Sequence, residues 1–100
     1  MMKKSKGKKS SGNVFRDLGF GPRDAENLQV RAQLMTEIEK YIQKEKITQA
    51  DAATLFGVTQ PRISDLVRGK IHLFTVDTLI SMLTHAGLSV SVQVKRSRAA

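Results

Sequence analysis

The 100-residue sequence contains no cysteine, so a disulfide framework and a cysteine-based zinc site are both excluded. The absence of thiols also fits a reducing cytoplasm. The N-terminal segment is basic, but no apolar stretch of the kind found in signal peptides follows it, and no run of about 18 apolar residues occurs anywhere. We therefore predict one small cytoplasmic domain without a membrane-spanning segment.

Patterns that carry catalysis are also lacking. The two histidines, His72 and His85, have no metal-ligand or catalytic partner at a meaningful spacing. The sequence contains no glycine-rich phosphate loop, Walker motif or nucleophile elbow. We therefore predict that the protein is not an enzyme, has no metal site and needs no cofactor.

The positive charge of the sequence is confined to its two ends. The formal net charge is +8, and residues 1–12 and 95–98 contribute all of it, because residues 13–94 hold nine basic and nine acidic side chains. Net charge therefore does not identify the central part as a nucleic-acid binder. We predict a domain over residues 13–94 between basic tails at 1–12 and 95–100. The tails are either phosphate-binding arms or solubilising disordered segments.

Residues 47–70 carry the clearest structural pattern, which predicts two short helices joined by a turn. Thr48 precedes a helix that begins near Gln49, because its hydroxyl can accept a hydrogen bond from a free N–H of the first turn. Gly57 stands where a helix end needs a residue with positive φ. Thr59 is a second N-cap, and another short helix follows it.

The apolar positions of this pair agree with helix-turn-helix geometry. Ala53 is small enough to let the two helices approach closely, while Val58 and Ile63 fill the angle between them. Gly69 ends the second helix. Helices this short are unstable alone, so they must pack on each other and on a larger body. An ordinary helical hairpin is the alternative interpretation.

The same stretch resembles the Xre/Cro/cI-type helix-turn-helix family. The matching positions are Gln49, Ala53, Gly57, Val58, Thr59, Gln60, Ile63, Leu66, Gly69 and Lys70. The longer run from residue 11 to residue 94 is similar to small single-domain Xre-type proteins, many of which are HigA-like antitoxins. This resemblance implies a mainly α fold, a lambda-repressor-like bundle of four to five helices.

Two further helices are expected to form the body of the domain. Asp24 can cap a long helix over residues 25–45. Its apolar stripe consists of Leu28, Ala32, Met35, Ile38 and Ile42. Residues 71–74 are predicted to be a loop, after which Thr75 caps another helix that Gly87 ends.

The segment over residues 13–23 is too apolar for a solvated linker, since Val14, Phe15, Leu18 and Phe20 lie within it. We therefore predict that it docks on another surface. That surface belongs to its own domain, to a second subunit or to another protein. In antitoxins, regions outside the DNA-binding unit often hold the toxin, whereas the plain alternative is a hydrophobic flap over the core.

The last element is predicted to be a β-strand over residues 88–94. Its alternating apolar residues are Leu88, Val90, Val92 and Val94. A lone strand leaves backbone N–H and C=O groups unpaired, so it needs a partner. We predict antiparallel pairing with its own copy across a two-fold axis, which makes a homodimer with these four residues at the interface. Pairing with the segment around Val14 is the alternative.

The second helix of the pair, residues 60–68, is predicted to enter the major groove of DNA. Ile63, Leu66 and Val67 face the core, so the opposite face is free to contact bases. The predicted base-reading residues are Gln60, Pro61, Arg62, Ser64 and Asp65.

These side chains differ in what they can recognise. Gln60 suits adenine, Arg62 suits guanine, and Asp65 can accept a hydrogen bond from cytosine N4. Pro61 departs from the family pattern of a polar residue, so it offers only shape or an apolar contact with a thymine methyl. The alternative for Asp65 is a surface ion pair with Arg62 or Arg68.

The predicted phosphate contacts are Thr48, Gln49, Thr59, Arg68 and Lys70. Gln49 stands at a helix N-terminus, which favours an anion. The family resemblance implies base contacts at Gln60, Pro61 and Asp65, and backbone contacts at Gln49, Arg68 and Lys70.

The functional hypothesis that follows is a dimeric repressor that binds a palindromic operator in double-stranded DNA. By resemblance, it also serves as an autorepressing antitoxin that binds a RelE-like ribonuclease toxin. The alternatives are a stand-alone Xre-type regulator without a toxin, and a protein-interaction module on the same fold.

Overall fold

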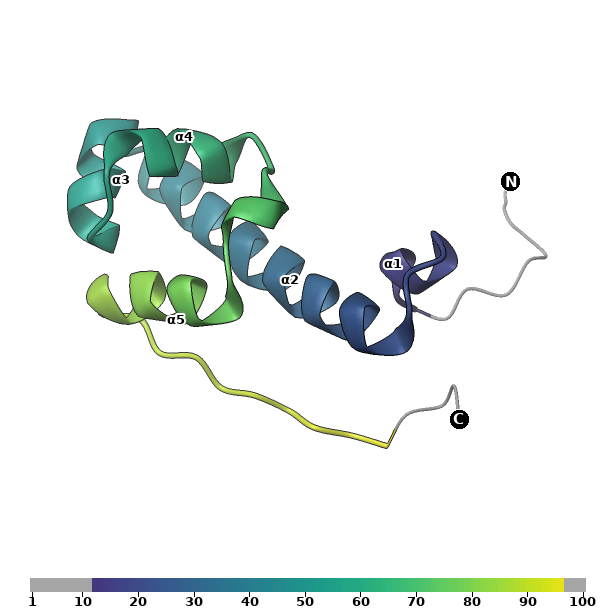
Figure 1. The fold of residues 1–100 in the computed structure, drawn as a ribbon. Helices are drawn as coiled ribbons and strands as arrows, with labels where there is room; N and C mark the ends of the chain where they lie inside the picture. The colour runs from purple at the N-terminus through teal and green to yellow at the C-terminus, as the bar shows by residue number, and fades with distance from the viewer. Residues whose placement is uncertain (1–11, 97–100) are drawn as a thin grey trace, which may run out of the picture.

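The computed structural model describes residues 12–96, which form five α-helices and one 3₁₀ helix but no strand (Figure 1). The elements in chain order are α1 (Val14–Asp17), α2 (Pro22–Glu45), α3 (Gln49–Phe56), α4 (Gln60–Val67), η1 (Ile71–Leu73) and α5 (Val76–His85). The predicted mainly α bundle is confirmed. Most of both predicted tails, residues 1–11 and 97–100, lies outside the described residues.

Helix α2 is the scaffold of the domain. Figure 1 shows α3, α4 and α5 gathered around its C-terminal half, while α1 lies at its N-terminal end. The core between these helices consists of Met35, Ile38, Ile42, Ala52, Ala53, Phe56, Ile63, Leu66, Phe74, Leu79, Met82 and Leu83. The predicted stripe on α2 is therefore buried in its second half, whereas Leu28 and Ala32 are only half-buried.

The start of α2 differs from the prediction. The helix begins at Pro22 with Gly21 as its N-cap, so the predicted cap at Asp24 is wrong. Proline suits the first turn because its φ is already helical and its missing N–H would have no partner there. Asp24 instead lies inside the first turn, where a carboxylate interacts favourably with the helix dipole.

The predicted caps of α3 and α5 are confirmed. The Thr48 hydroxyl accepts a hydrogen bond from the Asp51 N–H at 3.1 Å, and the Thr75 hydroxyl accepts one from the Thr78 N–H at 3.1 Å. Gly57 has the expected positive φ, 71°. These local bonds define where each helix begins and ends.

Thr59 occupies the N-cap position of α4, but its side chain makes no cap hydrogen bond, so that part of the prediction is wrong. One N–H that the hydroxyl could serve is missing, because Pro61 stands there. The next one, on Arg62, bonds the Thr59 backbone carbonyl at 3.1 Å. The hydroxyl of Thr59 is therefore not used as a cap.

The predicted loop over residues 71–74 is more ordered than expected. Residues 71–73 form the 3₁₀ turn η1, and the Phe74 side chain is only 1% exposed. A single aromatic residue between helices shows no periodicity, so its burial was not evident from the sequence.

The predicted C-terminal strand is not present in this single chain. Residues 88–96 belong to no helix or strand. Val14 lies in α1, so the alternative pairing within the chain is wrong. Leu88 and Val90 pack against the core, whereas Val92 and Val94 are 77% and 89% exposed. An extended segment becomes a strand only when a second strand satisfies its backbone groups.

The apolar segment over residues 13–23 docks on its own domain. The Asn13 side chain accepts a hydrogen bond from the Phe15 N–H at 2.9 Å and donates one to the Ala25 carbonyl at 3.0 Å. This buried asparagine therefore caps α1 and joins it to α2. Val14 and Leu18 remain 56% and 69% exposed.

Candidate nucleic-acid interface

Helices α3 and α4 form the predicted pair around the turn at Gly57. The Val58 N–H donates to the Ala53 carbonyl at 3.0 Å and closes the turn. On α4, Ile63 and Leu66 are 0% and 2% exposed. One face of α4 is therefore anchored in the core, and the opposite face is available to a ligand.

His85 supports this turn from α5. Its Nδ1 lies 2.9 Å from the Leu55 carbonyl, and because a carbonyl only accepts, the ring donates. The ring also covers Gly57, where an added Cβ would lie 2.8 Å from His85 Cδ2. From the sequence, His85 was assigned no partner. Its contacts reach residues about thirty positions away, and local patterns do not reveal such contacts.

The predicted base-reading residues begin at the first turn of α4. Gln60 and Pro61 are exposed, and Ser64 is half-buried. Arg62 is half-buried, and its guanidinium carbon lies 4.9 Å from the centroid of the Phe74 ring. The N-terminal end of α4 therefore presents polar side chains together with one arginine that rests on an aromatic ring.

Asp65 forms an ion pair with Lys70, with 3.6 Å between carboxylate and ammonium. The predicted alternative partners, Arg62 and Arg68, are therefore wrong. Lys70 lies beyond the end of α4 and returns to Asp65 because the chain turns at Gly69, where φ is 76°. Both charged groups are partly solvated, so the pair contributes at most about 1 kcal/mol to stability.

The predicted phosphate contacts occupy different surroundings. Gln49 is exposed at the first position of α3, and Arg68 is exposed just after α4. The Thr48 hydroxyl already accepts a cap bond, whereas the Thr59 hydroxyl is not used as a cap. Lys70 is shared with Asp65. Thus Gln49, Thr59 and Arg68 are the more readily available of the five.

Arg31 on α2 is a residue whose role the sequence analysis missed. Its Nη1 donates to the Ile71 carbonyl at 3.3 Å and to the Phe74 carbonyl at 3.2 Å, so it holds the chain between α4 and α5. Its Nε is buried and has no hydrogen-bond partner among the described residues. The sequence does indicate that Arg31 faces the core, because it lies seven positions before Ile38 and therefore on the apolar side of the helix.

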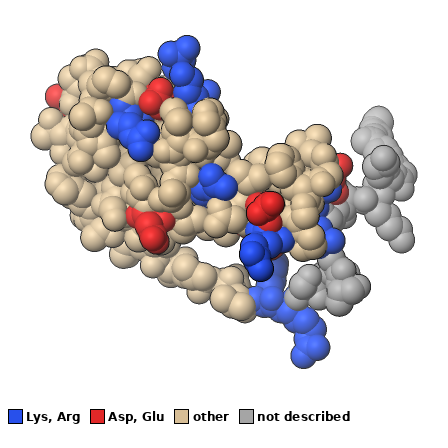
Figure 2. Space-filling view, in the orientation of Figure 1, with Lys and Arg blue, Asp and Glu red and all other residues tan. Residues whose placement is uncertain are grey.

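Charges are mixed over the surface of the domain. Figure 2 shows blue and red side chains interspersed over the helical body, with a further group of basic side chains at the end of the C-terminal segment. This distribution agrees with the balanced charge counted for residues 13–94. Figure 2 shows no large basic patch on this face, and the candidate interface is characterised by the shape and chemistry of α3 and α4.

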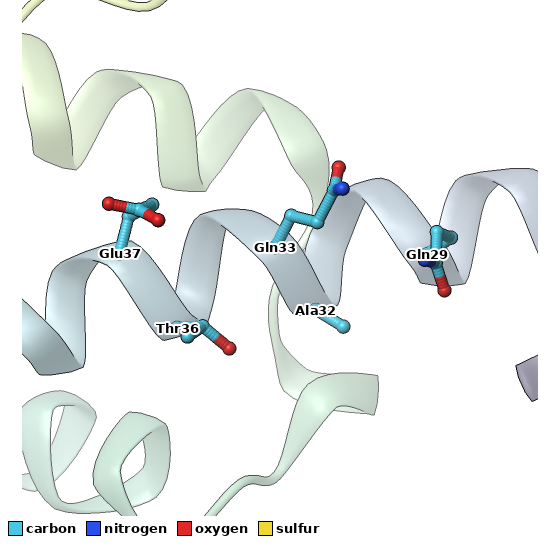
Figure 3. A pocket seen from close by; sticks show the side chains of 5 residues that line it. All are labelled: Gln29, Ala32, Gln33, Thr36 and Glu37. Atoms are coloured by element: carbon cyan, nitrogen blue, oxygen red, sulfur yellow. The ribbon is translucent and has the colours of Figure 1, made fainter. Parts of the chain in front are cut away.

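One hollow of about 200 Å³ is lined by Gln29, Ala32, Gln33, Thr36 and Glu37. Figure 3 shows that all five side chains come from α2 and do not converge on one point. No cluster of three metal-ligating residues occurs within residues 12–96, and no helix there is long and apolar enough to cross a membrane.

A short helix, a glycine turn and a second helix with one buried and one free face define a helix-turn-helix protein. Residues 14–95 match a family model described as a helix-turn-helix domain, and the chain belongs to this family. It is similar to a solved structure that carries the provisional name of an XRE family transcriptional regulator. The identity is 28%, the TM-score is 0.67, and the match covers 75% of this chain and 84% of that one.

A search of curated proteins found no match. The family resemblance that the sequence suggested is nevertheless confirmed, because the matching family model is that of a helix-turn-helix domain and the similar solved structure is named as an XRE family regulator.

Proposed function

We propose that the protein is a sequence-specific DNA-binding transcriptional regulator in which α4 lies in the major groove. The observation that carries this proposal is the division of α4 into a buried face with Ile63 and Leu66 and an accessible N-terminal end with Gln60 and Pro61. The B-DNA major groove admits one α-helix, and an N-terminal end of this kind brings side chains to base edges.

The residues take different roles in this proposal. Gln60 and Arg62 read bases, with Pro61 and Ser64 in close contact and Asp65 available to cytosine once it leaves Lys70. The backbone contacts come from Gln49, Thr59, Arg68, Lys70 and the first turn of α3 at Thr48. The proposed domain spans residues 13–94, and its basic tails add attraction to phosphates.

We further propose that the protein binds a palindromic operator as a homodimer. The segment over residues 88–94 supports this, because Val92 and Val94 lie exposed and no described residue pairs with the segment as a strand. Beside it is a hollow of about 350 Å³ lined by Leu34, Glu37, Tyr41, Leu83, Leu88, Ser89, Val90 and Ser91. Pairing two copies would cover these apolar groups and satisfy the backbone groups of both segments.

The double variant V92K/V94K tests this interface. Both side chains are almost fully exposed in the single chain, so the substitutions should leave folding unchanged. Four lysines would meet in the dimer, and we expect sedimentation to show monomers that bind paired half-sites about 10 base pairs apart only weakly. The matched control S91K/Q93K adds the same charge at alternate positions and should disrupt pairing less. If V92K/V94K sediments as a dimer, the strand pairing is wrong.

We propose an antitoxin role as the finer function, on the strength of the resemblance to HigA-like proteins. The exposed apolar residues in and directly after α1 support a protein partner, because Val14 and Leu18 lie outside the helix-turn-helix pair. A RelE-like ribonuclease is the expected toxin. A stand-alone regulator would have no such partner, and an interaction module would bind no specific duplex.

Co-expression with the reading frame adjacent to its gene distinguishes these alternatives. We expect that frame to encode a toxin whose growth arrest this protein relieves, and V14D/L18D to lose the relief while keeping operator binding. E26A, on the exposed surface of α2, is the control and should retain both. If the adjacent frame is harmless, the stand-alone regulator is the correct function.

A further inference from the structure

Arg62 rests on a platform that comes from outside the helix-turn-helix pair. The Phe74 ring lies 4.9 Å from the Arg62 guanidinium carbon, and Phe74 itself is 1% exposed. The Phe74 carbonyl accepts a hydrogen bond from Arg31 at 3.2 Å. Helices α2 and α4 and the chain before α5 therefore meet at one side chain of the predicted reading surface.

We propose that Phe74, held by Arg31, positions Arg62 for base recognition and thereby determines the specificity of binding. The inference rests on the proposed base-reading role of Arg62. A guanidinium that lies over an aromatic ring is attracted by the face of the ring, and this attraction uses none of its N–H donors as hydrogen bonds. Among the described residues, the Arg62 guanidinium donates no hydrogen bond. Its donors can therefore reach O6 and N7 of guanine while the stack on Phe74 persists.

The stack favours binding because it restricts Arg62 before DNA arrives. An arginine side chain has many rotamers, and ordering it on a base costs conformational entropy. Phe74 removes part of that freedom during folding, so less remains to be lost in the complex. If the Phe74 ring instead held the guanidinium away from the groove, removing the ring would strengthen DNA binding rather than weaken it.

A double-mutant cycle tests the coupling. The probe is a palindromic duplex selected from a randomised pool by the unaltered protein, and a scrambled duplex of equal length measures non-specific binding. F74L keeps an apolar side chain in the core but removes the ring. We expect F74L to weaken binding to the selected duplex about 5- to 10-fold. In the R62A background it should cause no further loss, because the arginine it positions is gone.

The outcomes separate this inference from the proposed function. If R62A alone leaves the preference for the selected duplex unchanged, the base-reading role fails. If R62A lowers that preference but F74L has an equal effect in both backgrounds, Phe74 acts only through stability, and the positioning role is wrong. Stronger binding of the selected duplex by F74L would also overturn the positioning role of Phe74.

A measurement on the unaltered protein avoids the risk that F74L does not fold. The Phe74 ring should shift the side-chain NMR resonances of Arg62 upfield, whereas Arg23, which is exposed at the start of α2, serves as the internal control. Resonances of Arg62 at the same position as those of Arg23 would overturn the stack. R62K, which keeps the charge without the planar group, should lose operator affinity to nearly the same extent as R62A.

Discussion

The double variant Q60A/R62A is expected to lose most of its preference for the operator over random DNA. Each good base contact contributes about 1 to 3 kcal/mol of discrimination, so the two together should cost roughly 2 to 6 kcal/mol of specific binding free energy. Affinity for random duplex should change little through the loss of Gln60, because this side chain is uncharged. The loss of the charged Arg62 should lower it modestly. Titrations at several salt concentrations measure both affinities.

Deletion of residues 1–12 is the comparison variant, because it removes five lysines and leaves the sequence of α4 unchanged. It should weaken specific and non-specific binding by similar factors and leave their ratio intact. The log–log salt dependence should flatten by up to about 0.9 for each lysine that meets a phosphate. If the deletion abolishes operator preference while Q60A/R62A retains it, α4 is not the reading element.

Gly57→Ala should produce the largest loss of stability among the glycine variants. The residue has φ 71°, which costs an L-residue about 1 to 2 kcal/mol. Its Cβ would also lie 2.8 Å from His85, which must move and give up its bond to the Leu55 carbonyl, at about 1 kcal/mol. Urea unfolding should therefore show a loss of roughly 2 to 3 kcal/mol.

Gly69→Ala is the control for the backbone contribution. Its φ is 76°, similar to that of Gly57, but an added Cβ meets no atom within 4 Å. The free energy of unfolding of Gly69→Ala should fall only by the cost of positive φ in an L-residue, about 1 to 2 kcal/mol. In the H85A background, Gly57→Ala should cost no more than Gly69→Ala, because the ring is absent. Equal losses for the two glycines in the unaltered background would show that His85 does not support the turn.

Local hydrogen bonds explain why the ends of several helices could be predicted. Thr48, Gly57 and Thr75 act on backbone groups three to five residues away, so their effects are visible in short stretches of sequence. Thr59 shows the limit of this reasoning. Its hydroxyl was expected to cap α4, but Pro61 removes one N–H and the Thr59 carbonyl takes the next.

The C-terminal segment marks a second limit. Its alternating valines indicate a strand, but the backbone of a strand is stable only when another strand completes the hydrogen bonds. Within one chain no described segment provides that partner. Alternation therefore predicts which side chains share a face, whereas the pairing requires a partner strand that the alternation does not identify.

The sequence alone determined the boundaries of α2, α3, α4 and α5 within a few residues, their apolar faces and the glycine turn, because caps, periodicity and positive φ are local properties. It did not predict α1 or η1. Only the tertiary structure decided the surroundings of the proposed reading surface. Arg31 and Phe74 are 43 positions apart, and His85 and Leu55 are 30 apart. Such contacts form because packing α2 and α5 against α3 and α4 brings distant side chains together, and no periodicity in the chain encodes them.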